Sequence, residues 1–101
     1  MITADFAILP VGIEDTELKN YVTKAVQSIK DSGLNYQLTG MGTHIEAKNL
    51  TELYAAIAKA QEAVFEAGTK RVYTVIKVDD RRDKDNRTLN AKIDSVNKKI
   101  I

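Results

Sequence analysis

The amino-acid sequence repeats one order of local patterns: a strand, an amphipathic helix that ends in glycine, and a second strand. Gly33 and Gly68 stand just past the two helices, where a left-handed backbone favours glycine. Because a doubled β-α-β unit has few ways to pair its strands, this repeat constrains the fold more than any single residue. Strands are expected at residues 2–10, 34–39, 43–48 and 71–79, and long helices over Asp15–Ser32 and from Asn49 to Gly68.

Local signals support these boundaries. Asp15 or Thr16 is expected to cap the first helix, and Asn49 with Glu52 three residues later resembles a capping box for the second. The run Gly40-Met41-Gly42 predicts a tight hairpin between two short strands. A last helix is expected from its apolar stripe of Leu89, Ile93, Val96 and Ile100.

Together these elements predict an α+β chain of the ferredoxin-like class, with the order β-α-β-β-α-β and an additional C-terminal helix. Right-handed crossovers give a four-stranded antiparallel sheet that carries both long helices on one face. The 101 residues are 44% hydrophobic, which is enough for one core. We therefore expect a single domain over residues 1–101.

The charge balance excludes several classes of partner. With 15 basic and 14 acidic side chains the net charge is +1, which argues against a nucleic-acid binder, since phosphate contacts need a basic surface. No apolar run approaches the roughly 20 residues that cross a bilayer, so no membrane partner is expected. The first residues do not resemble a secretory signal, and cysteine is absent. A cytoplasmic protein is expected.

The predicted sheet has one face for the helices and one face that they leave open. The helix side holds Phe6, Ile8, Leu38, Ile45, Val72 and Ile76. The open side holds Asp5, Ala7, Leu9, Gln37, Thr39, His44, Glu46, Tyr73, Val75 and Lys77. Because the open side mixes apolar and polar groups, we expect it to pair with a second copy, as a dimer or tetramer, to line a ligand cleft, or to do both.

Asp5 and Glu46 are the most informative polar residues of that open side. They belong to adjacent central strands, and two acids in close proximity need a cation, a hydrogen-bond donor or a proton. Lys77 on the neighbouring strand can supply the cation, which is the structural interpretation. The functional interpretation is that the acids accept hydrogen bonds from a cationic or amine-bearing ligand.

Catalytic and cofactor signals are weak. His44 is the only histidine, with no cysteine and no nearby serine to form a nucleophile–base pair, so no enzyme, no metal site and no cofactor are expected. The run from Asp79 to Asp85 alternates in charge and predicts a solvated loop, unless Arg81 or Arg82 reaches a ligand or partner. The stripe of the last helix is expected to pack on its own domain or on a symmetry mate; the alternative is that it is a partner-binding helix.

Five motifs, taken in order, resemble the family of small thiamine-binding proteins, which is akin to the tandem-repeat YkoF proteins. They are Pro10-Val-Gly12, Ser32-Gly-Leu-Asn-Tyr36, Met41-Gly-Thr-His-Ile-Glu46, Ala67-Gly-Thr-Lys-Arg-Val72 and Ile76-Lys-Val-Asp-Asp-Arg81. The resemblance implies a ferredoxin-like fold, assembly through the sheets, no known catalytic activity and a thiamine-like ligand. Ala47 replaces the glycine that usually follows the glutamate, and its methyl group is expected to narrow a pocket beside Glu46.

The resemblance suggests which side chains hold such a ligand. Thiamine has a cationic thiazolium ring and an aminopyrimidine, whose amine needs an acceptor. Glu46 and Asp5 are expected to supply acceptor and countercharge, Thr43 a hydroxyl, and Leu9 or Tyr36 an apolar wall. The expected ligand-binding residues are Asp5, Leu9, Pro10, Tyr36, Thr43, Glu46 and Lys77. The predicted function is a carrier or sensor of thiamine or its hydroxymethylpyrimidine part; the alternative is an assembly module without a small-molecule ligand.

Overall fold

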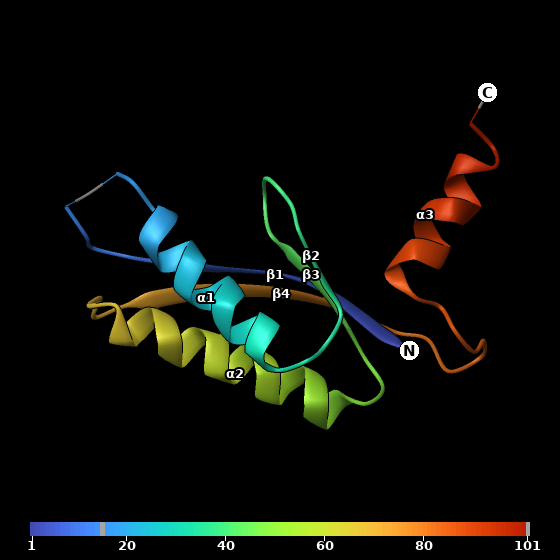
Figure 1. Cartoon of the computed structure of the whole chain (residues 1–101), viewed down its shortest axis with the longest axis horizontal. Helices are drawn as coiled ribbons and strands as arrows, with labels where there is room; N and C mark the ends of the chain where they lie inside the picture. Colours follow the sequence, from blue (N-terminus) through green and yellow to red (C-terminus); the bar gives the residue numbers. More distant parts are fainter. Residues whose placement is uncertain (15, 101) are drawn as a thin grey trace.

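The computed structural model describes residues 1–14 and 16–100 (Figure 1). Four strands and three helices follow one another along this part of the chain. They are β1 (Ile2–Pro10), α1 (Lys19–Asp31), β2 (Tyr36–Leu38), β3 (Thr43–Ala47), α2 (Leu50–Glu66), β4 (Val72–Asp80) and α3 (Leu89–Asn97). This α+β order fits a ferredoxin-like fold, as the sequence predicts.

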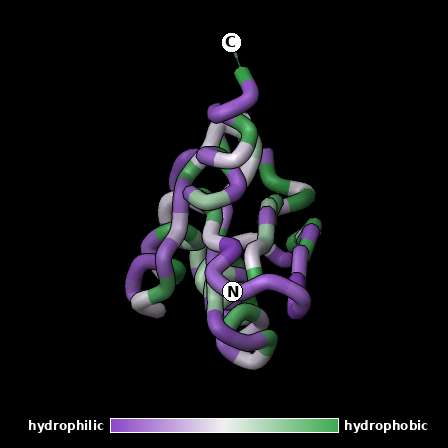
Figure 2. Tube along the Cα trace, turned by 90° about the vertical axis from the view of Figure 1, so that its right-hand side faces the viewer, coloured by the Kyte–Doolittle hydropathy of each residue, from purple (hydrophilic) through white to green (hydrophobic). Residues whose placement is uncertain are grey.

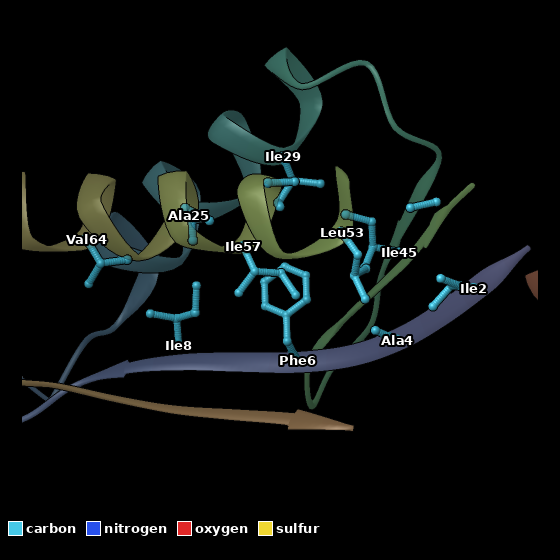
Figure 3. Close-up of a cluster of buried hydrophobic side chains, with 13 residues drawn as sticks. Ile2, Ala4, Phe6, Ile8, Ala25, Ile29, Ile45, Leu53, Ile57 and Val64 are labelled. Atoms are coloured by element: carbon cyan, nitrogen blue, oxygen red, sulfur yellow. The ribbon is translucent and has the colours of Figure 1, made fainter. Parts of the chain in front are cut away.

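The four strands form one antiparallel sheet in the order β2-β3-β1-β4, with the long strand β1 in its centre. Helices α1 and α2 cover one face, and the core lies between them and the sheet (Figure 3). Phe6 and Ile8 point from β1 toward α2, which contributes Ile57 and Val64 to the same core cluster. Burying these apolar side chains drives the chain to place both helices on the same side of the sheet.

The strand register confirms the predicted division of the sheet into two faces. Phe6 pairs with Thr43 on β3 and with Ile76 on β4, so these three residues share the helix side. Asp5 pairs with His44 and with Lys77, so these share the open side. Because side chains alternate along a strand, these pairs also determine on which face each remaining side chain of the sheet lies.

The start of the first helix was predicted too early. Helix α1 begins at Lys19, with Leu18 at the N-cap and no side-chain cap, so Thr16 does not cap it; Asp15 lies outside the described residues. The capping signal is misplaced because residues after β1 first carry the chain from the sheet up to the helix layer. The second helix is as expected, since the Asn49 side chain accepts a hydrogen bond of 2.9 Å from the Glu52 amide.

Glycine closes both long helices as predicted. Gly33 and Gly68 follow α1 and α2 with φ angles of 79° and 115°, which side chains other than glycine rarely adopt. The strands after them begin slightly later than the patterns suggest, at Tyr36 and at Val72. Because residues at strand ends lack a pairing partner on one side, alternation alone does not fix these ends.

Helix α3 stands away from the rest of the molecule, at the end of the sheet where β1 begins (Figure 1). Thr88 caps it by accepting a hydrogen bond from the Ala91 amide. Leu89 is buried, but the apolar residues further along the helix are exposed. Figure 2 shows hydrophobic and hydrophilic positions alternating around the tube close to the C-terminus. Within the described part of the chain, no helix has the length and apolar character that would span a membrane.

Candidate functional site

Strand β1 is longer than its partner β3, so the second half of β1 extends beyond the end of β3. The β1–β3 ladder ends where Phe6 pairs with Thr43, whereas β4 accompanies β1 as far as Pro10. In the described part of the chain, no strand therefore lies beside the main-chain edge of residues 7–10 on the β3 side. The β2–β3 hairpin and helix α1 surround the gap instead, and they leave a pocket there.

This apolar pocket has a volume of about 290 Å³. It lies between the second half of β1, one face of α1 and the hairpin. Among the described residues that line it, none carries an ionisable side chain, and the side-chain hydroxyls are those of Thr39 and Thr43. The lining comprises Phe6, Ala7, Ile8, Leu9, Leu18, Val22, Ala25, Val26, Leu38, Thr39, Gly40, Met41, Gly42 and Thr43. Such a cavity suits a neutral, largely apolar ring.

A second pocket, of about 280 Å³, lies on the open face over the first half of β1. Asp5 lies in this open-face pocket with its carboxylate 3.7 Å from His44 Nε2, and Lys77 is directly opposite it on β4. Lys92 of α3 bridges to Asp79 at the far side, and this hydrogen bond lowers the pKa of Asp79 below its usual value. The lining is Thr3, Ala4, Asp5, His44, Lys77, Asp79, Leu89 and Lys92. Acids and bases balance, which distinguishes this pocket from the apolar one.

Gly42 separates the two pockets. It lines the apolar pocket, and a β-carbon at this position would stand 2.7 Å from Asp5 Oδ1 and 3.0 Å from the Phe6 carbonyl oxygen. The Asp5 carboxylate therefore rests against the bare α-carbon of Gly42. Glycine is needed here for close approach between the hairpin and β1 rather than for a positive φ angle.

Replacing Gly42 with alanine is expected to push the Asp5 carboxylate aside and to strain the last β1–β3 pair. Because the Phe6 carbonyl is main chain and cannot move freely, we expect a loss of about 1–3 kcal/mol in unfolding free energy. Gly40→Ala is the matched control, since a β-carbon there meets nothing within 4 Å. Urea unfolding of both variants measures the difference, and equal stability would contradict the close approach.

The seven predicted ligand-binding residues fall into three groups. Asp5 and Lys77 line the open-face pocket, and Leu9 and Thr43 line the apolar pocket. The remaining three line neither pocket: Pro10, Tyr36 and Glu46. Thr43 and Tyr36 belong to the helix side of the sheet, because Thr43 pairs with Phe6 and Tyr36 with Ile45. The predicted set therefore spans both faces of the sheet.

Glu46 is buried on the open side and uses both carboxylate oxygens inside the protein. Oε1 accepts a hydrogen bond from the Asn35 side chain, and Oε2 accepts one of 2.9 Å from the Leu89 amide. The Leu89 amide is one of the free N–H groups at the start of α3, so Glu46 ties that helix to β3. Asp5 lies diagonally from it on β1, on the same face, as predicted.

Glu46→Gln is expected to loosen α3. A glutamine has one acceptor oxygen, so either Asn35 or the Leu89 amide loses its partner, which costs about 1–3 kcal/mol at a buried site. Amide hydrogen exchange should then speed up through residues 89–97 and not in α2. Glu52→Gln, at an exposed position in the first turn of α2, is the control. Unchanged exchange in α3 would contradict the anchoring role.

The expectation about Ala47 was wrong. Its methyl group lies on the helix side, 1% exposed within the core cluster, whereas the Glu46 side chain lies on the open side. Adjacent side chains of a strand point to opposite faces, so this methyl does not narrow a space beside Glu46. It contributes to core packing instead.

The sequence interpretation missed the α1 wall of the apolar pocket. The expected amphipathic helix is present, but Leu18, Val22 and Val26, at the start and along the apolar side of α1, line an unfilled space. A usable signal was present, because nine residues of the first strand cannot all pair with a much shorter third strand. The described residues hold no group of three or more potential metal-ligating side chains.

The sequence predicts that Arg81 and Arg82 lie in a solvated loop, unless one of them reaches a ligand or partner. Each pairs with an acid two positions away, Arg81 with Asp83 and Arg82 with Asp80. These hydrogen bonds raise the pKa of both arginines and lower the pKa of both aspartates. The contacts are local and exposed, as expected for a solvated loop.

Comparison with known proteins gives consistent matches over nearly the whole chain. The model of a family described as thiamine-binding protein matches residues 4–97. A UPF0045 protein of Methanothermobacter thermautotrophicus is 48% identical over 99% of this chain and 100% of its own length. The UPF0045 protein YqgV of Bacillus subtilis is 43% identical over 99% of this chain and 98% of its own.

Solved structures match as well. The hypothetical protein MJ1052 of Methanocaldococcus jannaschii superposes with a TM-score of 0.85, at 29% identity and 95% coverage of both chains. A Thermotoga maritima protein, whose name refers to thiamine biosynthesis/salvage, superposes with a TM-score of 0.79 over 94% of this chain and 97% of its own. At 19% identity the second match shows the fold alone.

Proposed function

Because the chain belongs to the family of thiamine-binding proteins, we propose that it binds thiamine through the pyrimidine half, in the apolar pocket beside β1. It then acts in the cytoplasm as a carrier or sensor of thiamine or of free hydroxymethylpyrimidine. The observation that carries this proposal is the gap in the β1–β3 ladder, which leaves a ring-sized cavity open to unpaired main chain.

The size of the apolar pocket favours one ring over two. Ligand pockets typically measure about 300–1,000 Å³, and this one, at about 290 Å³, is at the lower end. Among the described residues, the lining has no countercharge for a permanent cation, and an unpaired buried charge is costly. The neutral aminopyrimidine therefore fits inside, and the thiazolium ring stays outside.

Polar contacts for the pyrimidine are available at two places. The Thr43 hydroxyl is both a donor and an acceptor, which suits a ring nitrogen or the exocyclic amine. The unpaired edge of β1 at residues 7–10 offers main-chain N–H and C=O groups in fixed positions. Leu9 borders the pocket at this edge and adds apolar contact.

In this proposal the other predicted residues either balance the charge of the ligand or hold the surrounding strands and helices in place. Asp5, held against Gly42, supplies the countercharge for the thiazolium ring, and Lys77 opposite it limits the local negative charge. Glu46 fixes Asn35 and the start of α3. Tyr36 packs against the core, and Pro10 pairs with Val72 at the end of β1, so both hold the surrounding strands in place.

Isothermal calorimetry tests the proposal with three compounds: thiamine, hydroxymethylpyrimidine and hydroxyethylthiazole. We expect heat from the first two and none from the thiazole, because the pyrimidine half carries the binding. Absence of heat from both pyrimidine compounds at submillimolar concentration, with the protein shown to be folded, would reject the proposal.

Asp5→Asn tests the placement of charge. Removing the carboxylate charge should weaken thiamine several-fold and leave hydroxymethylpyrimidine nearly unchanged, because the second compound has no cation. Asp31→Asn, at the exposed end of α1, is the control. An equal loss for both compounds would instead make Asp5 a partner of the pyrimidine amine.

Self-association through the open face is the second candidate role. The apolar side chains of Leu9, Tyr73 and Val75 are 39%, 58% and 51% exposed there, and a sheet face of this kind gains stability when it is covered. We propose a homo-oligomer, dimer or tetramer, built through this face. The binding role needs no catalytic step, and we propose none.

A further inference from the structure

Exposed apolar side chains surround the mouth of the apolar pocket. Among the described residues that line this pocket, Leu9, Leu38 and Met41 are large, apolar and exposed, at 39%, 59% and 93%. Leu9 belongs to β1, and the other two belong to the β2–β3 hairpin. Because apolar surface is unfavourable in water, a rim of this kind gains free energy when a ligand covers it.

Met41 is the most exposed of the three and lies at the apex of the hairpin, between Gly40 and Gly42. The Thr39 hydroxyl holds the turn beneath it. Thr39 Oγ1 donates a hydrogen bond of 2.8 Å to the Gly42 carbonyl oxygen and accepts one of 3.1 Å from the Gly42 amide. The main chain that carries Met41 is therefore fixed beside the pocket, while the unbranched side chain can turn about its three rotatable bonds.

A ring bound in this pocket needs a cover on its solvent side. The walls come from β1, α1 and the hairpin, and the exposed rim shows that the pocket is open to water. Ligand sites usually bury about 70–90% of the surface of the ligand. The thioether of a methionine makes favourable contacts with aromatic rings and brings no charge. Met41 has the position and the chemistry to supply the missing contact.

We propose that Met41 closes the apolar pocket: when an aromatic ring binds, its side chain turns from solvent onto the ring and covers the mouth. Met41 thereby favours flat aromatic ligands over saturated rings of the same size. The inference rests on the proposed function, because it requires the pyrimidine ring to lie in this pocket. Since the contact exists only with ligand bound, losing it changes the affinity and leaves the stability of the free protein unchanged.

The methyl signal of Met41 tests the closure directly. The chain has two methionines, so protein labelled with ¹³C at its methionine methyl groups gives two signals, and Met41→Leu assigns them. Titration with hydroxymethylpyrimidine should move the Met41 signal upfield, because a methyl group over the face of an aromatic ring is shielded, and should leave the Met1 signal in place. A Met41 signal that does not move while calorimetry shows binding overturns the closure and leaves the proposed function standing. Absence of both heat and signal change removes both.

Two substitutions measure the effect on affinity. Met41→Ala removes the covering side chain, and Met41→Gln keeps its length but replaces the apolar end with an amide. Both should weaken hydroxymethylpyrimidine about three- to tenfold in calorimetry. The urea midpoint of the free protein should stay at the wild-type value, because Met41 is 93% exposed. Ile93→Ala, at an exposed apolar position of α3 outside the pocket, is the control and should bind like wild type. Wild-type affinity in both Met41 variants, or a parallel loss of stability, overturns the inference.

Competition between two simple alcohols tests the selectivity for a flat ring. Benzyl alcohol and cyclohexylmethanol have rings of similar size, and only the first is aromatic. In the wild-type protein benzyl alcohol should displace hydroxymethylpyrimidine at the lower concentration, and in Met41→Ala the difference between the two alcohols should shrink. A difference of the same size in both proteins overturns the selective role of Met41.

Discussion

Val22→Phe should weaken the binding of hydroxymethylpyrimidine strongly while the protein stays folded. Val22 is half-buried on α1 and lines the apolar pocket, so a phenylalanine ring there occupies the space proposed for the pyrimidine. Because the ring fills a cavity instead of displacing packed atoms, we expect less than about 1.5 kcal/mol of destabilisation. Affinity measured by calorimetry should fall at least about tenfold, which corresponds to about 1.4 kcal/mol.

The control for this prediction is Asn20→Phe on the same helix. Asn20 is exposed and outside the pocket, so the same aromatic residue there should leave the affinity unchanged. Thermal unfolding of both variants checks that the fold is intact. Wild-type affinity in a folded Val22→Phe protein would place the ligand somewhere else.

Phe6→Ala should have the largest effect on stability, about 3–5 kcal/mol. The ring is 2% exposed and lies between the sheet and α2, close to Ile57 and Leu53 (Figure 3). Its removal leaves a cavity under the helix layer, at the position where the β1–β3 ladder ends. Since small domains are stable by only about 5–15 kcal/mol, the urea midpoint should fall markedly.

Phe65→Ala separates this effect from a general loss of aromatic area. Phe65 is half-buried on α2 and outside the core cluster, so its removal should cost less than half as much. If the two variants unfold at the same urea concentration, Phe6 is not the centre of the core.

The order of the strands and helices could be predicted from the sequence, and so could the face of the sheet on which each side chain lies. Alternation along β1 and β4 assigns Asp5 and Phe6 to opposite sides, because a strand has a period of two. Glycine after each long helix marks where the chain turns back, which fixes the β-α-β repeat. These signals are local and are carried by neighbouring residues.

The candidate site was harder to predict from the sequence, because the apolar pocket forms where the pairing of β1 with β3 stops. Asp5 and Glu46 were placed correctly on one face. The alternation along the strands does not show that both carboxylate oxygens of Glu46 accept hydrogen bonds, from the Asn35 side chain and from the Leu89 amide. Those partners are 11 and 43 residues away in sequence. Thr43 and Tyr36 were grouped with the open-face acids by resemblance, although their position in the register turns them to the helix side.

The account depends on a ring bound in the gap beside the second half of β1. Amide chemical shifts of ¹⁵N-labelled protein, followed during titration with hydroxymethylpyrimidine, test this directly. We predict the largest changes at Ile8, Leu9, Val22, Gly42 and Thr43, which border the apolar pocket. Changes confined to Lys77, Asp79 and Lys92 on the open face would contradict it.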